Sequence, residues 1–200
     1  MTQTKTQLVA SPLNLNGADL TFPSTQGSAD QFLKNGSTAG TLEFATHRGF
    51  TTYAIICDQK ADSDNGGDFT NGAWRTRNLN TEIADPDNIV VIASDQFTLQ
   101  AGSYLIEASA PAYKVNNHQT RLYNATTSSV VQYGKNAYSD STENVADESV
   151  VVARVTITGA TAFEIQHRAS ATKATNGFGN TVSGFGGVGI FTVVKIFKEA

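Results

Sequence analysis

The sequence is poor in cysteine and in charge. Its single cysteine, Cys57, cannot form a disulfide within the chain, and it lies in an apolar run where we expect an inert thiol. Charged residues make up only 16% of the chain and the net charge is −4, so neither nucleic acid nor an anionic membrane is an expected partner. No apolar run is long enough to cross a bilayer, and the opening MTQTKTQ is too polar for a signal peptide. We expect synthesis in the cytoplasm without membrane insertion.

Motifs for catalysis or cofactor binding are also missing. No Gly-x-Ser-x-Gly elbow occurs, and the glycine-rich stretch 176–187 lacks the Lys-Ser/Thr end and the following helix of a phosphate loop. The three histidines, His47, His118 and His167, share no spacing that would make a zinc site. Glycoside hydrolysis needs two carboxylates at a cleft, and the acids here cluster in polar loops without a recognisable pair. We therefore expect no enzymatic activity, no cofactor and no metal site.

The acidic stretch 58–68 is the one candidate for a cation. Its second part, Asp62-Ser63-Asp64-Asn65-Gly66-Gly67-Asp68, resembles the start of a calcium loop. Gly66 stands at the fifth position, however, and Ala73 stands where the final bidentate acid should lie. The pattern favours a plain surface loop and leaves calcium binding by 58–68 open.

What the sequence does contain is strand and turn chemistry. The chain is 40% apolar and rich in Thr, Asn, Ser and Gly, which suits strands better than surface helices. Apolar and polar residues alternate over 97–100, 104–109 and 119–124, with a tight turn at Ala101-Gly102, and Pro111 is expected to end the second strand. Short strands at this spacing are typical of a sandwich or barrel, with almost no helix.

Four further segments are assigned from the same pattern. Residues 50–57 are the first strand of the globular part, and residues 89–93 form a continuous β-branched run, as in a strand buried on both sides. Residues 150–157 and 163–168 should pair as a hairpin across Thr158-Gly159-Ala160. The polar, acidic stretch 134–148 is predicted to form a loop.

Two strands carry predictions about individual side chains. In 73–81, Trp74 should anchor a sheet face, while Arg75 and Arg77 should face solvent or a neighbouring subunit. In 190–197, alternate side chains point to opposite faces of the expected strand. The set that contains the charged Lys195 is expected to face outward, so the inward set is Ile190, Thr192, Val194 and Ile196.

Several of these segments carry a family resemblance. The run Phe97-x-Leu99-x-Ala101-Gly102-x-Tyr104-Leu105-Ile106, followed by Arg121-Leu122-Tyr123-Asn124, resembles the core signature of the trimeric jelly rolls of the complement globular head and tumour necrosis factor class, in the version found on bacteriophage fibres. Residues 163–168 and the closing run 188–198 fit the same class. The resemblance spans about residues 50–200 and implies an all-β jelly-roll sandwich that forms a homotrimer. Tyr53, Tyr104, Tyr113, Tyr123 and 191–197 supply the aromatic surface expected for trimer contacts.

The first 48 residues read as an extended arm that precedes a domain over 49–200. Their apolar residues come in short pairs separated by turn residues, too sparse to close a core. Residues 20–33 and 40–45 resemble a linker unit found ahead of terminal domains in phage tail fibres. The alternative is a solvated tail whose apolar residues occur by chance. We expect the arm to attach to the virion through Leu13, Leu15, Leu20, Phe22, Phe32 and Leu33.

Function follows from the resemblance and from the loops. The favoured interpretation is a non-enzymatic, trimeric tail-fibre-type protein on the virion surface, bound to other virion proteins and contacting a host-surface glycan or protein. Its receptor contacts are expected at Phe178, Phe185, Asn180 and Tyr138, because exposed aromatics at a rim commonly form binding surfaces. The alternative for Phe178 and Phe185 is that they pack under the barrel. One alternative is a capsid decoration or head-fibre protein attached by the arm. A remoter one is a carbohydrate-binding β-domain of a bacterial enzyme.

Overall fold

A computed structural model describes residues 13–15, 18–28, 31–46 and 49–200 of the protein. The chain divides into two compact units, one formed by residues 1–49 with Ala200 and the other by Phe50–Glu199. The described residues form strands, turns and loops only, and no helix among them could cross a membrane. His47, Ala29 and Asp30, which enter the sequence predictions, lie outside the described residues.

The first unit consists of two small hairpins. Strand β1 (Leu13–Leu15) pairs with β2 (Ala18–Leu20), and β3 (Gln31–Asn35) pairs with β4 (Leu42–Thr46). No side chain that is described in this unit is fully buried. Phe22, Phe32 and Leu33 are exposed and Leu20 is half-buried, in keeping with a segment that has too few apolar residues to form a core. That these residues attach to a virion stays a prediction.

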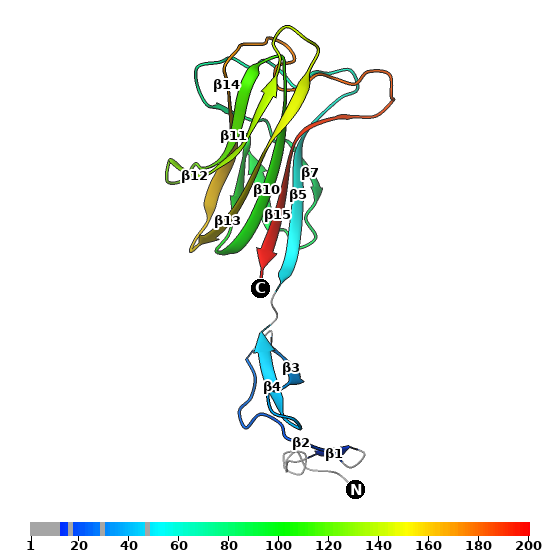
Figure 1. Ribbon diagram of the computed structural model, residues 1–200, viewed down its shortest axis with the longest axis vertical. Helices are drawn as coiled ribbons and strands as arrows, with labels where there is room; N and C mark the ends of the chain where they lie inside the picture. The colour runs from blue at the N-terminus through cyan, green and yellow to red at the C-terminus, as the bar shows by residue number, and fades with distance from the viewer. Residues whose placement is uncertain (1–12, 16–17, 29–30, 47–48) are drawn as a thin grey trace. The chain divides into compact units, whose positions relative to one another are not determined.

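The second unit is a sandwich of two antiparallel sheets, and every strand pair in it is antiparallel (Figure 1). Sheet 1 has the order β13-β10-β15-β5-β7, and sheet 2 has the order β12-β11-β14-β9-β8, with β6 also paired to β14. The strands of sheet 1 are β5 (Phe50–Lys60), β7 (Thr81–Ala84), β10 (Gly102–Tyr113), β13 (Ala146–Ile157) and β15 (Gly189–Glu199). Those of sheet 2 are β6 (Arg75–Thr76), β8 (Val90–Ala93), β9 (Gln96–Leu99), β11 (Asn116–Asn124), β12 (Ser129–Ser139) and β14 (Thr161–Ala169).

The core lies between the sheets and follows the predicted alternation. In β10 every second side chain from Tyr104 to Ala112 is buried, and Phe97, Leu99 and Leu122 face them from sheet 2. The closing strand β15 places Val194 and Ile196 in the core, which confirms that part of its predicted register. Near its start the pairing with β5 is irregular between Ile190 and Val193, so Ile190 is exposed while Phe191 and Thr192 are both buried.

Three strand predictions need correction. Pro111 does not end β10, which continues to Tyr113; pairing with β15 stops at Ser109, so the proline sits where that side of the strand needs no backbone donor. Residues 129–139 form β12, and the loop predicted over 134–148 shrinks to 140–145. Residues 90–93 are an edge strand rather than a doubly buried one, and Val91 is 60% exposed.

The predicted hairpin of 150–157 with 163–168 is also wrong. The two segments belong to different sheets: β13 pairs with β10, whereas β14 pairs with β11, β9 and β6. The turn at Thr158–Ala160 therefore carries the chain across the sandwich. Both strands have the same alternation that a hairpin would have, because each covers one side of the same core.

Arg77 is buried, contrary to the prediction that it faces solvent or a partner. Its guanidinium donates to the Thr192 hydroxyl (Nε to Oγ1, 2.8 Å) and to the carbonyl oxygens of Pro111 (Nη1, 3.2 Å) and Phe178 (Nη2, 2.7 Å). It also lies 4.0 Å from the centre of the Phe178 ring. Burial lowers the pKa of Arg77 to about 9, partly opposed by the charge of Asp58.

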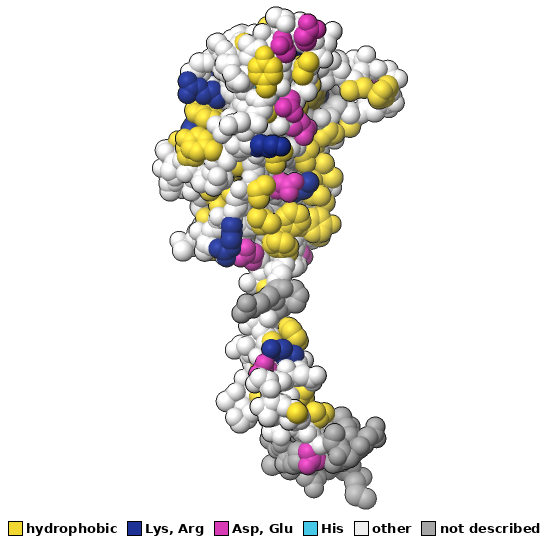
Figure 2. Space-filling view, in the orientation of Figure 1, with side chains coloured by type: hydrophobic (Ala, Val, Ile, Leu, Met, Phe, Trp, Pro, Cys, Tyr) yellow, Lys and Arg dark blue, Asp and Glu magenta, His cyan; other side chains and the backbone are white. Residues whose placement is uncertain are grey.

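The outer face of sheet 1 is apolar along one band. Tyr53, Leu105 and Phe197 lie opposite one another on β5, β10 and β15, and the Phe50 and Phe197 rings are 5.1 Å apart. Figure 2 shows hydrophobic side chains gathered over β5 and β15. In the adjoining row Glu107 and Lys195 form an ion pair of 3.0 Å.

Candidate functional site

The long loops of the sandwich lie at the end away from the start of β5 (Figure 1). Phe50 is opposite Glu199 at one end of sheet 1, and Lys60 is opposite Gly189 at the other. The loops 61–74, 140–145 and 170–188 all belong to this second end, which we call the loop end. It is the part of the domain with the most irregular backbone, and loops on a rigid scaffold are common places for binding residues.

The four predicted receptor-contact residues do not share one environment. Phe185 is 85% exposed, and Asn180 and Tyr138 are exposed too. Phe178 is only 7% exposed, because it packs against Phe69 with ring centres 4.6 Å apart and lies under the Arg77 guanidinium. Direct receptor contact by Phe178 is therefore corrected to a role in the interior, and contact by the other three stays a prediction.

Backbone hydrogen bonds hold the first part of loop 170–188 against neighbouring loops. Phe178 donates to the carbonyl of Gly67 (3.0 Å), Gly66 donates to that of Gly179 (2.9 Å), and the carbonyl of Gly177 accepts from Tyr113 (3.0 Å). A side chain at Gly177 or Gly179 would collide with Phe69 or Phe191. These glycines are thus required by close packing, whereas the residues 182–188 that follow are exposed.

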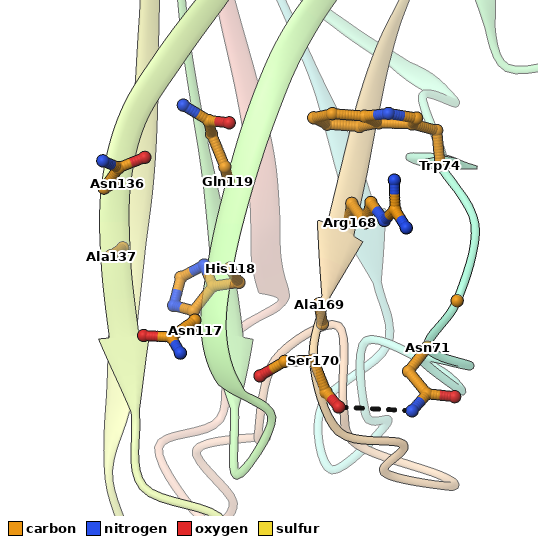
Figure 3. A pocket seen from close by; sticks show the side chains of 11 residues that line it. Asn71, Trp74, Asn117, His118, Gln119, Asn136, Ala137, Arg168, Ala169 and Ser170 are labelled. Atoms are coloured by element: carbon orange, nitrogen blue, oxygen red, sulfur yellow. Dashed lines mark hydrogen bonds between the residues drawn. The ribbon is translucent and has the colours of Figure 1, made fainter.

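A groove of about 590 Å³ lies on the outer face of sheet 2 near the loop end (Figure 3). The loop before β6 supplies Asn71, Gly72 and Trp74, and the ends of β11, β12 and β14 supply the rest: Asn117, His118, Gln119, Asn136, Ala137, Arg168, Ala169 and Ser170. Gln119 is opposite Asn136 on one side and Arg168 on the other, so these three outward side chains form one row across three strands. We call this site the amide groove.

Trp74, the chain's only tryptophan, is held in the groove wall by a polar chain. The guanidinium of Arg121 lies 4.2 Å from the centre of the Trp74 ring and donates to Gln166 (Nε to Oε1, 2.7 Å). Gln166 in turn donates to Glu164, whose other oxygen accepts from the Thr76 hydroxyl at 3.1 Å. Since Gln166 and Glu164 are themselves buried, the indole is positioned before any ligand arrives.

The polar groups along the groove differ in how far they are already satisfied. Asn71 is held by the Ser170 carbonyl (3.2 Å) and by Thr172, and Gln119 donates to the carbonyl of Gly134 (2.9 Å). The side-chain amides of Asn117 and Asn136 and the guanidinium of Arg168 make no hydrogen bond or ion pair with the described part of the chain. No Asp or Glu lines the groove. Its free groups therefore include the amides of Asn117 and Asn136, the Ser170 hydroxyl and one cation, Arg168.

Two buried histidines meet beneath the groove. His118 Nδ1 and His167 Nε2 are 3.0 Å apart, and the His167 ring packs on Phe69 with centres 4.9 Å apart. Burial lowers the pKa of His118 to about 4, and burial with the nearby charge of Arg77 puts the pKa of His167 well below its usual value. Sequence spacing concealed this pair, because the two residues are brought together only by the β11–β14 register.

No group of three or more His, Cys, Asp or Glu side chains is placed to share a metal ion within the described ranges. In the acidic stretch 58–68, Asp58 is buried beside Lys60 (3.1 Å), and burial raises the pKa of Asp58. Asp68 accepts a hydrogen bond from the backbone of Thr175. Cys57 is buried, and burial together with Asp58 raises the pKa of its thiol, in the direction expected for the inert thiol predicted from its apolar run.

Comparison with known proteins defines the fold. No protein-family model matches this chain, and no curated protein sequence does. Similar solved structures include the globular domain of a zebrafish complement 1qA protein (12% identity, TM-score 0.45, 74% of this chain and 96% of that chain) and murine APRIL (8%, 0.46, 74% and 98%). The Eiger TNF of S. frugiperda matches with 10% identity and a TM-score of 0.50 over 76% of this chain and 94% of that one. The fold is a jelly roll.

This result confirms the fold class predicted from the motifs at 97–106 and 121–124. At 10% identity the likeness of the jelly-roll domain to the Eiger TNF concerns the fold alone. Function has to be argued from this chain's own surfaces: the outer face of sheet 1, the loop end and the amide groove.

Proposed function

We propose that this chain is a non-enzymatic virion protein of the bacteriophage fibre type. Three copies assemble through the outer face of sheet 1, residues 1–48 attach the trimer to the virion surface, and the loop end contacts the host. The proposal is supported by the sequence motifs, which resemble the trimeric jelly rolls of phage fibres. The observation that carries it is the apolar band of Tyr53, Leu105 and Phe197 on sheet 1.

An apolar band of this kind is unusual on a water-facing sheet. Outer faces of antiparallel sheets normally carry polar side chains, and exposed aromatic and aliphatic clusters mark interaction surfaces. Tyr53 and Phe50 on β5 are both close to half exposed, and Phe197 on β15 and Leu105 on β10 are half-buried beside them. Tyr104, which was expected to belong to this surface, is instead fully buried with its hydroxyl on the Gln100 carbonyl (2.9 Å).

Two ion pairs lie on the outer face of sheet 1 next to the apolar band. Lys195 pairs with Glu107 (3.0 Å), and Arg154 pairs with Glu199 through two hydrogen bonds of 2.8 and 2.6 Å. Exposed pairs of this kind add little to the stability of one subunit. In an assembly they are desolvated and penalise wrong registers, so they contribute specificity.

The ends of the domain separate attachment from recognition. The chain enters the sandwich at Phe50, at the end opposite the loop end, so a segment that precedes Phe50 joins the domain away from Phe185 and Asn180. A fibre needs this polarity, because its anchor and its receptor surface serve different partners. Attachment through residues 1–48 and recognition through the loop end are therefore compatible in one chain.

The oligomeric state tests the proposal. Light scattering of the purified chain at micromolar concentration should return about 64 kDa, three times the 21.2 kDa of one chain. Leu105→Lys should yield monomers, because it places a charge in the apolar band. Val182→Lys, which changes an exposed valine at the loop end, should leave the trimer intact. A mass near 21 kDa for the unchanged protein would overturn the proposal.

A further inference from the structure

The amide groove has the composition of a sugar-binding surface. An indole ring offers a flat apolar face on which the C–H face of a pyranose can stack. Side-chain amides offer a donor and an acceptor together, which matches the hydroxyl groups of a sugar. Trp74 supplies the first element, and Asn117 and Asn136, with unused amides, supply the second. Figure 3 shows the indole edge-on, with the Arg168 guanidinium beneath it and the amides across the groove.

The rigidity of the groove supports a ligand role over a purely structural one. Trp74 is positioned by Arg121, Gln166 and Glu164, and the amide row lies on paired strands rather than on a free loop. The Trp74 ring also packs against the Tyr133 ring, with ring centres 5.9 Å apart, which adds to its fixed position. The volume of about 590 Å³ falls within the range of small-ligand sites.

Arg168 adds a charge requirement to the site. It is exposed, has no partner among the described residues, and stands in a row with Gln119 and Asn136, whose side chains carry no charge. Glu164 is four residues away on the same face of β14, but its two oxygens accept hydrogen bonds from Gln166 and Thr76. An unpaired guanidinium presents a planar fork of donors that fits a carboxylate or a phosphate.

We infer that the amide groove binds an oligosaccharide that carries an anionic group, with a sugar ring stacked on Trp74, its hydroxyls on Asn117 and Asn136, and its anion on Arg168. This inference rests on the proposed function, since it names the class of host-surface ligand that such a protein would recognise. It places recognition on the side of the loop end, at a site that the sequence prediction of Phe185, Asn180 and Tyr138 did not include.

The single tryptophan makes the test direct. Because Trp74 is the chain's only tryptophan, its fluorescence reports on the groove without interference. The full chain is titrated with hexuronic-acid oligosaccharides, with phosphorylated mannose oligosaccharides and with neutral glucan oligosaccharides of equal length. We expect a saturable change in emission with at least one anionic series, and binding at least tenfold weaker for the neutral series. The carboxylate and phosphate arms distinguish the two sources of charge.

Matched variants assign the contacts. Arg168→Ala should weaken binding of the anionic sugar at least tenfold and remove the preference over the neutral one. Asn136→Ala should weaken both classes alike. Lys34→Ala removes one positive charge from the other unit and should change neither, which controls for net charge. Trp74→Phe, followed by calorimetry instead of fluorescence, should retain part of the affinity because a stacking face remains.

Three results would overturn the inference: no saturable signal with either anionic series, equal affinity for neutral and anionic sugars, or unchanged affinity in Arg168→Ala. The same experiments test the proposed function independently of the groove. If the protein is a trimer that adsorbs to cells, and Arg168→Ala adsorbs equally well, the groove is not the receptor site although the attachment function stands. If sugar binding is confirmed while the mass is that of one chain, the groove assignment stands and the trimeric fibre does not.

Discussion

Replacing Arg77 is the sharpest test of how this jelly roll is held together. The residue is fully buried, and its guanidinium joins β15 through Thr192, the end of β10 through Pro111 and loop 170–188 through Phe178. It has no ion-pair partner within 4 Å in the described structure; Asp58 acts on it only at longer range. Arg77→Ala therefore removes three hydrogen bonds at once, and two of them, to the Thr192 hydroxyl and the Phe178 carbonyl, are buried.

The expected loss can be estimated from those contacts. An unsatisfied buried polar group costs about 1 to 3 kcal/mol, and the space left by the side chain adds a cavity term. We expect Arg77→Ala to lower the free energy of unfolding by about 4 kcal/mol, a large part of the total stability of a typical domain. Arg77→Met should lose less, because it fills the space and removes a charge whose burial is unfavourable, as the lowered pKa of Arg77 indicates.

The measurement is urea unfolding at one fixed protein concentration, because an assembled protein unfolds in a concentration-dependent way. Arg75→Ala is the matched control: it lies two residues away, is exposed, and should change the free energy of unfolding by less than about 0.5 kcal/mol. If Arg77→Ala were within about 1 kcal/mol of the unchanged protein, the network would not support the fold as argued here.

Three further predictions concern other parts of the chain. Stability should fall as pH drops from 6.5 towards 4, by about 1.4 kcal/mol per pH unit for each buried histidine that stays neutral. The reason is that an unfolded His takes up a proton near pH 6.5, whereas the pKa of folded His118 is about 4 and that of folded His167 also lies well below 6.5; equal stability at pH 6.5 and 5 would contradict this. Val194→Asp should prevent soluble folding, since it puts an unpaired charge into the core, and a normal melting curve would disprove that register. A chain that begins at Gly49 should still fold, trimerise and adsorb to cells yet fail to join particles, whereas a capsid decoration protein so shortened would show no adsorption; full incorporation would rule out the arm as the anchor.

The sequence alone determined the fold class and much of the core. Alternation over two-residue steps is a local property, so it located β9, β10, β11 and the inward side chains Thr192, Val194 and Ile196 of β15. It failed at Ile190 and Phe191, where the irregular pairing with β5 exposes the first and buries the second. The motifs at 97–106 and 121–124 predicted the jelly-roll class, because they consist of residues that pack in the core of such a fold. Buried Cys57 followed from its apolar run.

Only the tertiary structure decided which strands are neighbours and which outward faces are covered. Alternation states which residues share a face, not what lies against that face, so Arg77 was assigned to solvent although loop 170–188 covers it. For the same reason, the sequence could not show that β13 and β14 belong to different sheets or that His118 and His167 meet. It could not show the amide groove either, because the residues of the groove come from three strands and a loop. These features depend on sheet register between segments tens of residues apart, and no local pattern encodes that pairing.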